Sequence, residues 1–68
     1  MKKVKSSNIK FIDYDEDESI LTVGFKNGSV YEYYDVPENL YLKLGRASSV
    51  GSFFHYNIRN DFEYERLE

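Results

Sequence analysis

Hydrophobic and polar residues alternate in three successive segments of the chain, and this alternation predicts three β-strands. β-Branched and aromatic residues, which favour extended structure, are frequent in all three, and the predicted strands are residues 8–14, 19–25 and 29–36. In the second strand Leu21, Val23 and Phe25 share one face. The third strand has aromatic rings on both faces, which predicts that it is the central or best-covered strand of the sheet.

Short connections join these strands. The acidic run from Asp15 to Glu18 lies between the first and second strands and predicts a solvated turn. Asn27-Gly28 lies between the second and third, and an Asn-Gly pair between two alternating runs favours a tight hairpin with a type I′ turn. Parallel strands cannot be joined by such short turns, so the sheet is predicted to be antiparallel.

The hydrophobic period changes after the third strand and predicts two short helices. Pro37 suits the first position of a helix, and the apolar residues that follow have the spacing of one helical face: Leu40, Tyr41, Leu44 and Ala47. A second helix is predicted to begin at Gly51, with Ser52 as its N-cap. Phe54 and Ile58 lie four residues apart and should share its buried face.

These elements predict one α+β domain over residues 1–68, with a three-stranded antiparallel β-meander followed by two short helices packed on one face. Residues 1–7 are polar and are predicted to form a loose N-terminal arm. In the polar tail, Phe62 and Tyr64 are expected to pack back as a short extended segment. Leu67-Glu68 is typical of the residues left before a purification tag and is not used for the fold prediction.

Composition limits how such a domain is stabilised. A chain of 68 residues buries a modest share of its surface, and the absence of cysteine excludes disulfides and thiolate metal sites. Seven tyrosines and five phenylalanines therefore predict that aromatic packing stabilises the domain. No apolar run approaches a membrane span or a signal-peptide core, so we expect a cytoplasmic protein without membrane contact.

Charge is distributed unevenly around a net value of −3. The first ten residues contain four lysines and no acid, whereas residues 13–18 contain five acids and no base. An acidic total argues against a strong binder of the phosphate backbone, which would normally have a basic face. The lysines at the terminus are expected mainly to keep it soluble.

No motif for catalysis or metal binding is complete. Asp13, Asp15 and Asp17 resemble the start of a calcium-binding EF-hand loop, but Glu18 and Gly24 stand where that loop needs glycine and a bidentate glutamate. His55 is the single histidine and has no nucleophile motif or second metal ligand around it. We therefore expect neither an enzyme nor a bound cofactor or metal.

Tyr31 and Tyr33 fall on the same side of the third strand and allow two interpretations. They could be a stacking surface for single-stranded bases, with cations nearby. They could instead form the core under the helices, which so small a domain needs and which we favour. The candidate cations are Lys26, Lys43, Arg46 and Arg59. Arg59 could bind an anion or a partner carboxylate, or complement the C-terminus of the second helix.

Several short motifs together resemble the KTSC domain family over roughly residues 6–64. In chain order they are S-S-N-I (6–9), L-x-V-x-F (21–25), N-G (27–28), V-Y-x-Y-x-x-V-P (30–37), L-Y-x-x-L-x-x-A (40–47), S-x-G-x-F-F (49–54) and I-R (58–59). The family is named for its occurrence at the C-terminus of some lysyl-tRNA synthetases and also occurs as small stand-alone bacterial proteins. Family members tend to have asparagine after the Phe-Phe pair, where this chain has His55.

The resemblance implies a non-catalytic binding module, with RNA (tRNA or a single strand) as the favoured ligand. Under this hypothesis Tyr31 or Tyr33 stacks on bases, and Lys43, Arg46 and Arg59 contact phosphate. The alternative is a protein-interaction domain that recruits its partner through a sheet edge or an aromatic patch. The sequence does not predict an oligomeric state.

Overall fold

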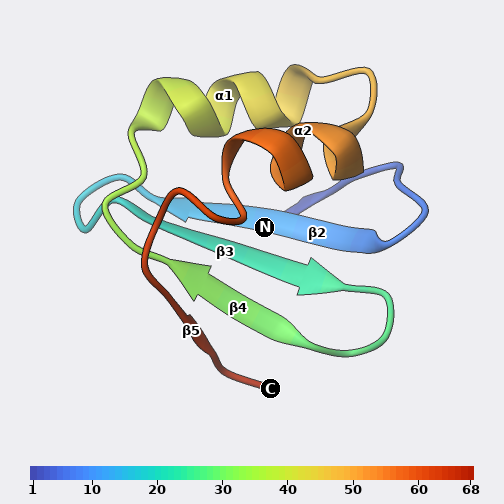
Figure 1. The fold of residues 1–68 in the computed structure, drawn as a ribbon, viewed down its shortest axis with the longest axis horizontal. Helices are drawn as coiled ribbons and strands as arrows, with labels where there is room; N and C mark the ends of the chain where they lie inside the picture. Colours follow the sequence, from blue (N-terminus) through green and yellow to red (C-terminus); the bar gives the residue numbers. More distant parts are fainter.

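The computed structural model, which describes residues 1–68, has a five-stranded antiparallel sheet with both helices on one face (Figure 1). The strands lie in the sheet in chain order, each paired with the next. The elements are β1 (Lys2–Lys3), β2 (Ile9–Asp15), β3 (Ile20–Phe25), β4 (Val30–Tyr33), α1 (Glu38–Arg46), α2 (Val50–Asn57) and β5 (Tyr64–Arg66). The predicted α+β class and antiparallel meander are confirmed, and the number of strands is corrected from three to five.

The two additional strands lie at the edges of the sheet and are short. β1 lies within the segment that was predicted as a loose arm, and it pairs with β2. β5 pairs with β4, which places Tyr64 opposite Tyr33. The sequence contains no alternation long enough to predict strands of two and three residues. The last residues continue this pairing, because the Leu67 amide donates to the Val30 carbonyl at 2.7 Å.

The third predicted strand ends three residues early. β4 stops at Tyr33 and not at Val36, because Asp35 adopts a left-handed backbone with φ of 57°. Aspartate tolerates this region better than most residues, and its backbone cannot continue a strand. The chain turns here, and Val36 is fully buried beneath the entry to α1.

The hairpin at Asn27-Gly28 is wider than predicted. Phe25 and Ser29 close the loop through an amide-to-carbonyl bond of 2.8 Å, and the Gly28 amide donates to the Phe25 carbonyl. Only Gly28 has a positive φ, of 96°, whereas a type I′ turn needs two such residues. The connection is therefore a three-residue loop with glycine in the left-handed position.

Both helices begin close to the predicted positions. Pro37 is the N-cap of α1, one residue before the first helical position that we predicted for it. In α2 the cap is Ser49 and not Ser52, because the Ser49 hydroxyl accepts from the Ser52 amide. The first helical turn therefore starts at Val50, one residue before the predicted Gly51.

The core fills the space between the helices and the sheet. Its ten buried hydrophobic residues are Ile9, Ile12, Leu21, Val23, Tyr33, Val36, Leu44, Val50, Phe54 and Ile58. The predicted faces of both helices contribute: Leu44 from α1 and Phe54 from α2 are buried, with Ile58 just beyond the end of α2. Leu40 and Tyr41 pack against this cluster from α1.

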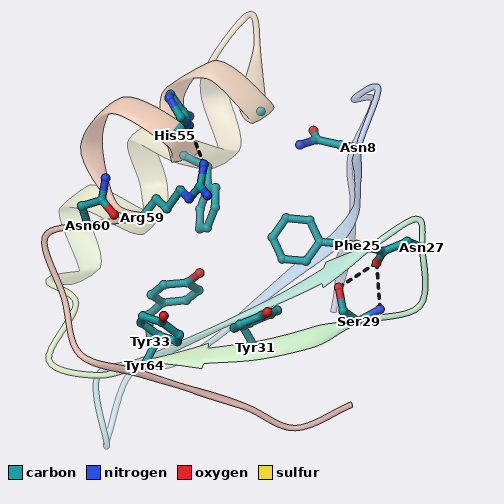
Figure 2. A pocket seen from close by; sticks show the side chains of 12 residues that line it. Asn8, Phe25, Asn27, Ser29, Tyr31, Tyr33, His55, Arg59, Asn60 and Tyr64 are labelled. Atoms are coloured by element: carbon teal, nitrogen blue, oxygen red, sulfur yellow. Dashed lines mark hydrogen bonds between the residues drawn. The ribbon is translucent and has the colours of Figure 1, made fainter.

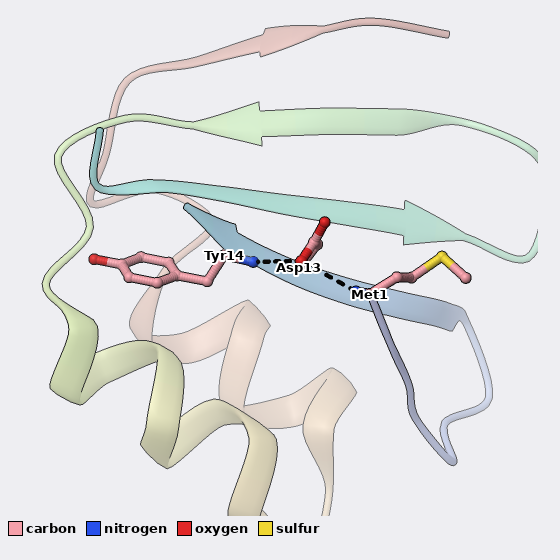
Figure 3. A network of polar contacts seen from close by, with 3 residues as sticks. All are labelled: Met1, Asp13 and Tyr14. Atoms are coloured by element: carbon pink, nitrogen blue, oxygen red, sulfur yellow. Dashed lines mark hydrogen bonds and ion pairs between the residues drawn. The ribbon is translucent and has the colours of Figure 1, made fainter. Parts of the chain in front are cut away.

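Tyr14 links β2 to the start of α1. Its ring stacks on Tyr41 with centroids 4.9 Å apart, and its hydroxyl donates to the Val36 carbonyl at 2.6 Å. Its amide donates to Asp13, whose carboxylate also lies 3.3 Å from the amino group of Met1 (Figure 3). Both partners of that ion pair are more than half exposed, so it adds little stability.

Gly24 has no room for a larger residue. It lies opposite Phe11 in the β2–β3 register, and a Cβ placed on it would lie 2.0 Å from Cε2 of the Phe11 ring. The ring therefore covers the glycine on the sheet face that carries no helix, and this contact restricts the residue that position 24 accepts.

We expect Gly24→Ala to lower the free energy of unfolding by roughly 1–3 kcal/mol, the usual cost of overpacking. Denaturant unfolding of the variant measures this loss. Gly45→Ala is the control, because its Cβ would approach only Nζ of Lys2, the flexible end of a side chain. That variant should be neutral or gain up to about 1 kcal/mol from helix propensity. An equal change in unfolding free energy in Gly24→Ala and Gly45→Ala would contradict the close contact between Gly24 and Phe11.

Candidate functional site

An open hollow of about 400 Å³ lies between α2 and the sheet, beside strands β3 to β5 (Figure 2). Five of its twelve lining residues are hydrophobic. They are all aromatic: Phe25, Tyr31, Tyr33, Phe54 and Tyr64. The remaining lining residues are polar or glycine, so the hollow has an aromatic floor and a polar rim.

Tyr33 is the best-packed ring of the floor. It meets Phe54 of α2 edge to face, with centroids 5.3 Å apart and planes at 80°. Its ring forms a triangle with Tyr31 and with Tyr64 of β5: the centroids lie 6.3 Å apart for Tyr31–Tyr33, 5.5 Å for Tyr33–Tyr64 and 5.7 Å for Tyr31–Tyr64. Phe25 completes the group by packing against both Tyr31 and Phe54.

Exposure increases from the centre of this cluster outward. Tyr33 is only 4% exposed, Tyr31 is half-buried, and Tyr64 is 57% exposed. Tyr33 therefore belongs to the core while also lining the hollow, whereas Tyr64 keeps ring surface exposed. The guanidinium of Arg66 lies 5.8 Å from the centroid of the Tyr31 ring, so a second cation besides Arg59 adjoins the aromatic floor. Burial, together with the neighbouring Tyr31 and Tyr64 hydroxyls, raises the pKa of Tyr33 to about 12, so at neutral pH it stays a neutral hydroxyl.

Arg59 supplies the cation of the rim. It follows the end of α2, and its Nη1 lies 3.2 Å from Nδ1 of His55 (Figure 2). A guanidinium can only donate, so His55 accepts at Nδ1 and carries its proton on Nε2. Arg59 also lowers the pKa of Tyr33, against the larger effect of burial, and both residues line the hollow.

The polar rim is held by local hydrogen bonds. The Asn27 side chain accepts from the Ser29 amide and hydroxyl at 3.0 and 2.7 Å, which fixes the hairpin end of the hollow. Asn8 lies at the same end, because its carbonyl accepts from the Lys26 amide at 2.8 Å. It packs on α2 so closely that a Cβ on Gly51 would lie 2.8 Å from the Asn8 Oδ1. A side chain at position 51 would therefore push Asn8 away from α2.

No acidic side chain lines the hollow, although the chain contains 12 acids. Glu65, next to Tyr64, is engaged elsewhere and accepts from the Tyr34 hydroxyl. Lys43 and Arg46 are exposed in the last turn of α1 and do not line the hollow, and neither does Lys26. Of the five predicted site residues, the structure brings together Tyr31, Tyr33 and Arg59.

The sequence-based prediction missed three of the residues that complete this site. Phe25 shares a face with Leu21 and Val23, so the alternation that assigned it to the core could also have placed it beside Tyr31. Tyr64 lies on a strand too short to show a period. Asn8 reaches the site only because the turn before β2 packs against α2.

The KTSC domain family model matches residues 5–62. The chain belongs to the KTSC domain family. A KTSC domain protein from Yersinia pestis has a crystal structure that superposes with a TM-score of 0.92 at 34% identity, covering 98% of this chain and 94% of that one. The shared fold therefore extends over nearly the whole domain.

Two kinds of relative match by sequence. A lysine–tRNA ligase from Trichormus variabilis is 42% identical over 65 residues, which is 96% of this chain but 12% of the ligase. A protein from Stutzerimonas stutzeri is 32% identical with both chains fully covered. The chain thus spans about an eighth of the ligase and the full length of the Stutzerimonas stutzeri protein.

The structure has neither a membrane-crossing helix nor a clustered metal site. It contains no helix of the length and apolarity that crossing a membrane requires. It also has no group of three or more histidine, cysteine or acidic side chains placed to hold a metal. The acidic turn instead folds on itself, with the Asp15 carboxylate accepting from the Asp17 and Glu18 amides.

We expect the stability of the domain to fall as pH rises from about 10 to 12, because an unfolded tyrosine ionises near pH 10 and Tyr33 near 12. The folded state retains the proton longer, so this contribution is complete below pH 10 and lost above 12. Tyr33→Phe should flatten the fall in unfolding free energy. Two other tyrosines contribute to the remaining slope. Partial burial and hydrogen bonds to Glu65 and Glu32 raise the pKa of Tyr34 to about 12, and burial together with Asp13 raises the pKa of Tyr41. If Tyr33→Phe and the parent showed the same dependence of unfolding free energy on pH, the raised pKa of Tyr33 would be contradicted.

Proposed function

We propose that this KTSC domain is a non-catalytic module that binds single-stranded RNA in the hollow between α2 and β3–β5. The observation that carries the proposal is an aromatic floor under a cation, without any acid, in a chain of net charge −3. Bases stack on aromatic rings regardless of their identity, and a guanidinium suits the adjoining phosphate. Here Tyr31 and Tyr64 would receive a base and Arg59 its phosphate.

The relatives support the same ligand class. The lysine–tRNA ligases that contain a matching segment act on tRNA, and a domain within such an enzyme has RNA close at hand. This support is an association and does not define a site. The hollow adds the physical argument, because its volume of about 400 Å³ falls in the range of pockets that hold small ligands.

Protein binding through a sheet edge is the weaker candidate. Strand addition needs a free edge long enough to form several backbone hydrogen bonds. Here the edges are β1, with two lysines, and β5, with three residues of which two are charged. Short, charged edge strands are a common device against such pairing.

An NMR titration of the labelled domain with an eight-residue oligouridylate and with tRNA tests the proposal. We expect shifts around Tyr31, Tyr64 and Arg59 that fade with added salt, by a slope of about 0.7 per phosphate contacted. Tyr31→Ala should weaken binding by roughly 1–3 kcal/mol, the usual contribution of one stacked base, whereas Tyr31→Phe keeps the ring and should bind as the parent does.

Charge controls separate a defined site from general attraction. Arg59→Ala should weaken RNA binding and reduce its salt slope. Lys43→Ala and Arg46→Ala remove equal charges outside the hollow and should leave the affinity nearly unchanged. An equal loss in all three variants would show non-specific attraction, and binding that is insensitive to salt would favour a protein partner over RNA.

A further inference from the structure

A second hollow, of about 440 Å³, adjoins the aromatic one at the start of α2. Its ten lining residues include one hydrophobic side chain, that of Tyr56, and no acid. The remaining lining residues are mostly hydroxyl and amide side chains, with Lys5 as the cation. The two hollows share three lining residues: Asn8, Gly51 and His55.

Tyr56 is the most exposed large hydrophobic side chain of the domain, at 79%. It contributes nothing to the core, so packing does not explain its place on α2. The His55 ring supports it edge-on, with centroids 4.9 Å apart and planes at 83°. Tyr56 lines the second hollow together with Lys5 and five serines.

The partition between the hollows is built from packed residues. Ser6 donates to Asn8 at 3.0 Å and accepts from two backbone amides, which fixes the turn that rests on Gly51. On the helix side, His55 contacts Arg59 of the first hollow and Tyr56 of the second. A chain crossing this partition would pass from one aromatic surface to the next.

We propose that the two hollows form one track for two successive nucleotides of single-stranded RNA. One base lies on Tyr31 and Tyr64, the phosphate lies at the partition near Lys5 and Arg59, and the second base stacks on Tyr56. This deepens the proposed function and rests on it. It identifies Tyr56 and Lys5 as binding residues that neither the family resemblance nor the sequence pattern singled out.

NMR titration of the intact domain with AMP, ADP and the dinucleotide ApA, repeated with UMP and UpU, tests the track. We expect each dinucleotide to bind roughly tenfold more tightly than its mononucleotide, as one added stacked base implies. ADP should bind less tightly than ApA, because it adds charge without a second base. Tyr56→Ala should abolish the advantage of the dinucleotide, and Tyr56→Phe should retain it.

The outcomes separate this inference from the proposed function. Shifts at Tyr31 and Tyr64 with equal affinity for ApA and AMP, unchanged in Tyr56→Ala, would overturn the track while leaving RNA binding in the first hollow. No shift at either hollow with any of the five ligands would overturn both. Lys5→Ala should weaken the binding of ApA several-fold. Lys3 lies outside both hollows, so Lys3→Ala is the matched control and should bind ApA as the parent does.

Discussion

The edge-to-face contact between Tyr33 and Phe54 is the interaction on which the candidate site depends. It joins β4 to α2 at 5.3 Å in the absence of any disulfide. Eight of the ten core residues are aliphatic, and Tyr33 and Phe54 are the two aromatic ones. This pair also lines the hollow, and the outer aromatic residues Phe25, Tyr31 and Tyr64 line it beside the contact.

The same aromatic residues therefore stabilise the fold and shape the surface. Tyr33 is buried and belongs to the core, Tyr31 is half-buried, and Tyr64 is mostly exposed. Of the two tyrosines on β4, Tyr33 is thus a core residue, whereas Tyr31 is a candidate binding residue. Neighbouring positions on one strand can differ in this way because α2 covers only part of the sheet face.

Local charge in this protein differs from its net charge. The acids are concentrated in the turn before β3, where Asp15 accepts from backbone amides, and Glu32 and Glu65 meet at the Tyr34 hydroxyl. Both hollows beside α2 are left without an acid. A phosphate-bearing ligand would therefore meet no carboxylate in the lining of either hollow. It would still be opposed by Asp61 and Glu63, which adjoin the lining residues Asn60 and Tyr64 in the chain and so act within a Debye length.

The sequence by itself determined the three inner strands, the antiparallel meander, both helices and their buried faces, because these follow from hydrophobic periods that repeat within one element. Only the tertiary structure decided the edge strand β1, which is too short to show a period and forms by pairing with β2. For β5 the sequence predicted a short extended segment at Phe62 and Tyr64, and the tertiary structure decided its pairing with β4. It also decided the site. Tyr31 is distant in the chain from Arg59 and Tyr64 and lies beside them only in the folded domain. Lys43 and Arg46 do not line the hollow, because packing sets which helix face lies over which strand, and no local pattern contains that information.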